Sequence, residues 1–204
     1  MVFSTKKLKN LVDSIELKDI NICFDIGANS GIFSYYLKKK YPNAEVHCFE
    51  PSPELIKCIE LNLKRFDNIY IRNQAICDTS GNIDFYVNKE SQQTKSLVID
   101  SVIPFCEGDS MHVISVESNT LDRYCSQNNI DGIDVLKVDI QGAEKSLLHG
   151  ARCMLNNVSL SIFEISFLDS DIFETSEILL NNFNKYEVIN EVKTGADIIF
   201  TKVN

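Results

Sequence analysis

The 204-residue sequence lacks any apolar run long enough to span a membrane. It also lacks a C-x-x-C pair, and none of its seven cysteines has a partner histidine at metal-ligand spacing. Scattered cysteines of this kind indicate free thiols in a reducing compartment. No signal peptide is apparent, so we expect a cytoplasmic protein without disulfides, a membrane span or a metal site.

Positive charge is also scarce: 20 Lys and Arg residues face 29 Asp and Glu residues, a formal net charge of −9 at pH 7. Nucleic-acid backbones require clustered Lys and Arg, so we expect no nucleic-acid partner. The sequence shows no internal repeat, low-complexity segment or linker, and 44% of its residues are hydrophobic. We therefore expect a single domain over residues 1–204, as a monomer or homodimer.

Residues 22–31 form the most informative stretch. The apolar run 22–26 is typical of a parallel strand buried on both faces, and a helix pattern begins at Ile32. A dinucleotide-binding G-x-G-x-x-G loop starting at Gly27 would need glycines where Asn29 and Ile32 stand. The observed pattern, acid-x-Gly-x-x-x-Gly from Asp25 to Gly31, is instead typical of loops that bind S-adenosylmethionine (SAM). In that interpretation Asp25 faces the ligand's ammonium; the alternative is a glycine turn without a ligand.

Glu50 follows a second predicted strand, residues 44–49, and lies 19 residues beyond Gly31. A carboxylate at this strand end can accept both hydroxyls of a ribose held by the first loop. The alternative is an exposed glutamate at a strand end. Pro51 and Pro53 prevent the strand from continuing, and a helix is predicted to begin near Ser52.

The rest of the chain alternates between helix and strand patterns. The predicted elements are a helix over 3–17, strands at 69–72, 83–87 and 113–116, a helix at 120–127, strands at 134–138 and 160–163, a helix marked by 178–183, and closing strands near 186–189 and 198–200. Strands 83–87 and 113–116 are expected to pair. Segment 88–112 has weak periodicity, which indicates a variable lid or an acceptor-binding segment.

This alternation predicts an α/β three-layer sandwich whose sheet is mostly parallel with an antiparallel last strand. Ligands of such sheets bind at the carboxyl ends of the strands. Asp25, Gly27, Glu50, Asp139 and Glu164 all stand at predicted carboxyl ends. We therefore expect these residues to gather at one edge of the sheet.

Several sequence blocks together resemble the FkbM-family methyltransferases. They are DIGANSG at 25–31, FEPSP at 49–53, NQAICD at 73–78, TLD at 120–122, LKVDIQGAE at 136–144 and FE at 163–164. The resemblance implies a class I, Rossmann-like methyltransferase fold. It also implies transfer of a methyl group from SAM, leaving S-adenosylhomocysteine, to a hydroxyl of a sugar, glycan or other small molecule such as a natural product.

The resemblance further implies which residues bind the cofactor. They are Asp25, Gly27, Ala28, Asn29 and Gly31 for the methionine part, Glu50 with Pro51 and Ser52 for the ribose, Ala75, Ile76 and Asp78 for the adenine, and Asp139 beside the sulfonium and the acceptor. Gln141 departs from the family pattern, in which a glutamate is common. We expect Gln141 to shape the turn.

A sugar hydroxyl is a weak nucleophile, so a general base is expected. Asp139 is the first candidate and Glu164 the second. Lys137 shares a strand face with Asp139 and either orients that carboxylate or forms a structural ion pair. His112 is an outside candidate for the base.

The role of one further residue and the choice between functions stay open on the sequence alone. Glu144 follows a glycine at a helix start, where an acid suits the helix dipole, and its role is either structural or functional. The rival functions are a nicotinamide-dependent oxidoreductase and a SAM-binding protein without catalysis.

Overall fold

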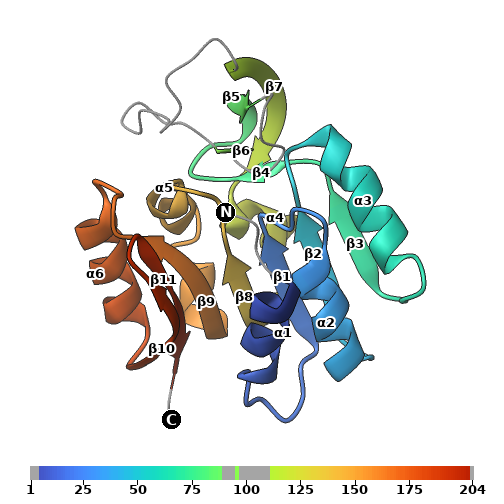
Figure 1. Cartoon of the computed structure of the whole chain (residues 1–204), viewed down its shortest axis with the longest axis vertical. Helices are drawn as coiled ribbons and strands as arrows, with labels where there is room; N and C mark the ends of the chain where they lie inside the picture. The colour runs from blue at the N-terminus through green and yellow to red at the C-terminus, as the bar shows by residue number, and fades with distance from the viewer. Residues whose placement is uncertain (1–4, 89–94, 97–110, 203–204) are drawn as a thin grey trace.

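The computed structural model describes residues 5–88, 95–96 and 111–202, and its main feature is a seven-stranded sheet (Figure 1). The strand order is β10-β11-β9-β8-β1-β2-β3. The strands are β1 (Ile22–Ile26), β2 (Glu45–Phe49), β3 (Ile69–Arg72), β8 (Ile133–Val138), β9 (Val158–Ser166), β10 (Lys185–Val192) and β11 (Gly195–Thr201). Every neighbouring pair from β9 to β3 is parallel, and β11 runs antiparallel between β9 and β10. The predicted mostly parallel sheet with an antiparallel last strand is confirmed.

Helices cover both faces of this sheet. The first face carries α1 (Thr5–Asp13), α2 (Ile32–Lys40) and α3 (Pro53–Leu63); the second carries α4 (Leu121–Gln127), α5 (Glu144–His149), the 3-10 turn η1 (Met154–Asn157) and α6 (Ile172–Asn182). Adjacent strand residues point to opposite faces. Cys23 accordingly packs in the apolar cluster between the sheet and the helices of the first face, and Phe24 packs in the cluster on the second face. The three-layer sandwich is confirmed.

A second, four-stranded sheet stands at the top of the view in Figure 1. Its strands, in order, are β4 (Ala75–Ile76), β7 (Met111–Asn119), β5 (Gly81–Asn88) and β6 (Lys95–Ser96). The predicted pairing of 83–87 with 113–116 is confirmed, since Ile83 lies opposite Val116 and Phe85 opposite Ile114. Most of segment 88–112 lies outside the described residues, so its predicted role stays a prediction.

Several element boundaries differ from the sequence-based expectation. The first helix ends at Asp13 rather than at residue 17, and α6 begins at Ile172, well before the apolar residues that mark it in the sequence. Strand β9 continues past Glu164 to Ser166, because antiparallel β11 keeps pairing with it as far as Gly195. Glu164 therefore lies within a strand rather than at its end.

Within the described ranges, every helix is too short or too polar to cross a bilayer.

Candidate active site

A cavity of about 370 Å³ opens where the carboxyl ends of β1, β2 and β8 meet. Its volume is at the lower end of the range for small-molecule sites. The residues that line it come from helices α1, α2 and α3, the end of β1 with the β1–α2 loop, the end of β2, Gln74 with strand β4, strand β5, and the end of β8 with the segment after it. Of the predicted site residues, those in the lining are Gly27, Ala28, Asn29, Glu50, Pro51, Ala75, Ile76, Lys137 and Asp139.

The β1–α2 loop takes a left-handed backbone at Gly27 (φ 73°), Asn29 (φ 53°) and Gly31 (φ 76°). The N–H groups of Gly27 and Ala28 both donate to the Phe49 carbonyl at 3.0 Å, which fixes the loop to the end of β2. A Cβ on Gly27 would lie 1.9 Å from the backbone oxygen of Asp139. Glycine is therefore required at 27 both by its dihedral angle and by the close approach of the chain after β8.

We expect Gly27→Ala to lower the free energy of unfolding by more than the roughly 1–2 kcal/mol of a left-handed non-glycine residue, because the methyl group also displaces Asp139. Gly81→Ala is the matched control: Gly81 has φ 142°, and within the described structure an added Cβ meets no atom within 4 Å. Urea unfolding of both variants measures the difference. An equal loss in the two would contradict a tight Gly27–Asp139 contact.

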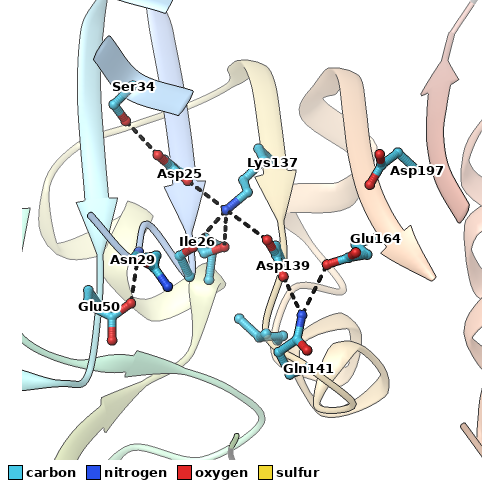
Figure 2. A network of polar contacts seen from close by, with 12 residues as sticks. Asp25, Ile26, Asn29, Ser34, Glu50, Lys137, Asp139, Gln141, Glu164 and Asp197 are labelled. Atoms are coloured by element: carbon cyan, nitrogen blue, oxygen red, sulfur yellow. Dashed lines mark hydrogen bonds and ion pairs between the residues drawn. The ribbon is translucent and has the colours of Figure 1, made fainter. Parts of the chain in front are cut away.

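Glu50 is held in one orientation at the cavity wall (Figure 2). Its Oε2 accepts a hydrogen bond from the Asn29 N–H at 2.9 Å, and its Oε1 accepts one from the Ser52 N–H at 2.9 Å. The Asn73 side chain donates to the carbonyls of Glu50 and Pro51 and so fixes the backbone here. Because each carboxylate oxygen can accept more than one hydrogen bond, Glu50 can also receive a vicinal diol.

Asp25 and Lys137 form an ion pair next to the β1–α2 loop (Figure 2). The Lys137 Nζ lies 3.0 Å from Asp25 Oδ1 and donates to the Gly27 carbonyl at 2.7 Å, while the Ser34 hydroxyl donates to Asp25 Oδ2 at 2.7 Å. Burial lowers the pKa of Lys137, but the charges of Asp25 and Asp139 outweigh it and the pKa is raised. Lys137 therefore stays protonated.

Asp25 itself lies outside the cavity lining. Its side chain is fully buried, and it is Lys137, on the neighbouring strand β8, that lines the cavity. Lys137 Nζ also lies 3.8 Å from Asp139 Oδ2. The main ion pair of Lys137 is therefore with Asp25, and Asp139 is a longer contact of the same ammonium.

Asp139 and Glu164 are bridged by Gln141 (Figure 2). The Gln141 Nε2 donates to Asp139 Oδ1 at 2.8 Å and to Glu164 Oε2 at 3.0 Å. Burial, followed by the charge of Asp139, raises the pKa of Glu164 to about 8. Glu164 is outside the described cavity lining, whereas Asp139 and Gln141 belong to it. Asp139 is therefore the carboxylate of this pair that lines the cavity.

Other predicted residues lie near the cavity without lining it. Gly31 faces Ile59 of α3, Ser52 is the N-cap of α3, and the Asp78 N–H donates to the Ser146 hydroxyl. The Glu144 carboxylate is buried and accepts the N–H of Gly142 at 2.9 Å. The side chain of His112 lies outside the described residues.

Sequence reasoning misses part of the lining: Thr5, Leu8, Gln74 and Phe85. The apolar stripe of the first helix is visible in the sequence, but on its own it indicates only packing on the sheet. Phe85 lies on a strand whose apolar residues alternate recognisably, but this alternation does not show that the Phe85 face of the strand lines the cavity.

The model of the methyltransferase FkbM domain family matches residues 25–188. The chain belongs to the FkbM methyltransferase family. The 2-O-methyltransferase NoeI of Sinorhizobium fredii is 25% identical over 205 residues, which cover 95% of this chain and 83% of NoeI. The family predicted from the sequence blocks is confirmed.

Solved structures agree with this FkbM assignment at the level of the fold. Precorrin-6y C5,15-methyltransferase from Geobacter metallireducens aligns with a TM-score of 0.60 at 13% identity, over 99% of this chain and 90% of that one. Fibrillarin from Aeropyrum pernix, solved with bound SAM, aligns with a TM-score of 0.53 at 13% identity, over 98% and 74%. The FkbM domain therefore has the class I SAM-dependent methyltransferase fold.

Proposed function

We propose that this FkbM domain transfers the methyl group of SAM to a hydroxyl group of a sugar, a glycan or a natural product. The observation that carries the proposal is a cavity lined together by the β1–α2 loop, Glu50 and Asp139. These three lie at the carboxyl ends of three different strands, β1, β2 and β8. The similarity to NoeI, a 2-O-methyltransferase, supports oxygen as the acceptor atom.

The residues of the cavity suit the three parts of SAM. The tight backbone at Gly27, Ala28 and Asn29 leaves room for the methionine tail beside the Lys137 ammonium, which can pair with its carboxylate. Glu50 receives the ribose hydroxyls, and the apolar side chains of Ala75 and Ile76 border the adenine. In this arrangement Asp25 acts on the tail only through Lys137 and the loop.

The chemistry asked of the chain is alignment and proton removal. The acceptor oxygen attacks the methyl carbon, the new O–C bond forms as the S–C bond breaks, and the sulfur leaves as a neutral thioether. Alignment of the three atoms supplies most of the rate enhancement. Asp139 takes the hydroxyl proton as the bond forms, a contribution of roughly 10²–10⁴-fold for a well-placed base.

The test is incubation with methyl-labelled SAM and a panel of neutral glycans and hydroxylated natural products, followed by mass spectrometry. We expect a labelled, base-stable ether on one acceptor class together with S-adenosylhomocysteine. SAM binding with no product from any acceptor would favour a SAM-binding protein without catalysis. Hydride exchange with a nicotinamide cofactor would favour the oxidoreductase.

A further inference from the structure

The turn after β8 holds the side-chain amide of Gln141 against two carboxylates, those of Asp139 and Glu164. Gln141 takes a left-handed backbone at φ 56° and is followed by Gly142 at φ 101°. The Glu144 carboxylate closes the turn by accepting the N–H groups of Ile140 at 3.4 Å and Gly142 at 2.9 Å. A left-handed conformation is unfavourable for glutamine, so other contacts must hold it. The result is that the Gln141 amide reaches Asp139 and Glu164 together.

Those carboxylates lie in a mostly acidic environment. Asp197 of β11 lies opposite Glu164 in the strand register, and Lys7 of α1 lies 3.4 Å from Glu164 Oε1 and 2.9 Å from Asp197 Oδ2. Lys137 is 3.8 Å from Asp139 but is mainly paired with Asp25. Two lysines thus face four carboxylates, and like charges at close range disfavour full ionisation.

We propose that Gln141 is a positioning residue whose amide holds Asp139 and Glu164 together and sets how readily this pair of carboxylates takes up a proton. The inference rests on the proposed function, because Asp139 is the base there. A neutral amide suits this role, because it supplies two N–H donors at one point without adding a charge.

The proposal depends on the type of residue at position 141. A methionine would keep the length of the side chain but remove both donors. A glutamate would keep the shape, remove both donors and bring a third carboxylate to the same point. Since donors to a carboxylate favour its charged form, both changes favour the protonated form of Glu164, and glutamate does so more strongly.

The experiment compares wild type, Gln141→Met and Gln141→Glu in two ways. The first is a ¹³C NMR titration of glutamate side-chain carboxyl carbons, with Glu164→Gln to assign the Glu164 signal. We expect the wild-type Glu164 pKa near 8, and higher midpoints in both variants. The second is the pH dependence of kcat with an acceptor from the glycan and natural-product panel. Its acid limb should move to higher pH, with kcat lower by about 10-fold or more and KM for SAM unchanged.

The outcomes separate this inference from the proposed function. An unchanged Glu164 midpoint in Gln141→Met would overturn the inference even if wild type methylates an acceptor. If no acceptor is methylated, the proposed function fails, while the titration still decides whether Gln141 controls the proton of the pair. A lower kcat whose acid limb stays at the wild-type pH would show that Gln141 has only a structural role, and it would also overturn the inference. Thermal stabilisation by SAM verifies that each variant is folded.

Discussion

Replacing Asp139 with asparagine is expected to lower kcat by roughly 10²–10⁴-fold while leaving SAM affinity close to that of the wild type. Asparagine keeps the shape of the side chain and can still accept the Gln141 hydrogen bond at its oxygen. It cannot take the hydroxyl proton. The loss should therefore affect the chemical step and not the binding of SAM. Product formation with the acceptor that the wild type methylates measures the first, and calorimetry measures the second.

Asp131→Asn is the matched control for this change, because Asp131 is an exposed residue just before the opposite end of the same strand β8. We expect its kcat to remain at the wild-type value. Normal turnover of Asp139→Asn with the true acceptor would remove Asp139 as the base, and Glu164 would then be the remaining carboxylate candidate.

Replacing Lys137 with methionine is expected to cost about 3–5 kcal/mol of unfolding free energy, the loss typical of breaking a buried ion pair. The Asp25 side chain is fully buried, and Lys137 is the cation that contacts it at 3.0 Å. Methionine would leave that carboxylate without its cation and the Gly27 carbonyl without its donor. The affinity for SAM should fall too, because the β1–α2 loop loses the hydrogen bond that Lys137 donates to the Gly27 carbonyl.

A double-mutant cycle isolates the pair. Asp25→Asn together with Lys137→Met removes both charges, so the double variant should be more stable than Lys137→Met alone. Lys64→Met, an exposed change at the end of α3, should alter the unfolding free energy by less than about 0.5 kcal/mol. A loss below about 1 kcal/mol in Lys137→Met by urea unfolding would mean that the ion pair does not support the loop.

The main sheet is predictable from the sequence because local patterns determine it. Buried parallel strands such as 22–26 are continuous apolar runs, and the glycine loop that follows has a backbone requirement that only particular residues meet. The carboxyl-end rule then places Glu50 and Asp139 at one edge of the sheet. These expectations need no knowledge of long-range contacts.

The parts that could not be predicted depend on contacts between distant segments. The sequence does not show that Lys137 lies beside Asp25 on the adjacent strand and pairs with it. The pairing of β4 with β7 joins residues more than forty positions apart, such as Ala75 and Ser118. Gln141 is expected only to shape a turn; its bridge from Asp139 to Glu164 depends on how far β9 extends and where β8 ends.

The central claim, that this cavity binds SAM through Glu50, is tested most directly by thermal unfolding with SAM, S-adenosylhomocysteine and NAD in parallel. Wild type is compared with Glu50→Ala and with the exposed control Glu60→Ala. At about 100 times the dissociation constant, SAM and S-adenosylhomocysteine should stabilise wild type and the control by roughly 2.7 kcal/mol, which raises the unfolding temperature by roughly 5–11 °C. Glu50→Ala should be stabilised far less. Stabilisation by NAD alone, or equal stabilisation of Glu50→Ala by SAM, would contradict it.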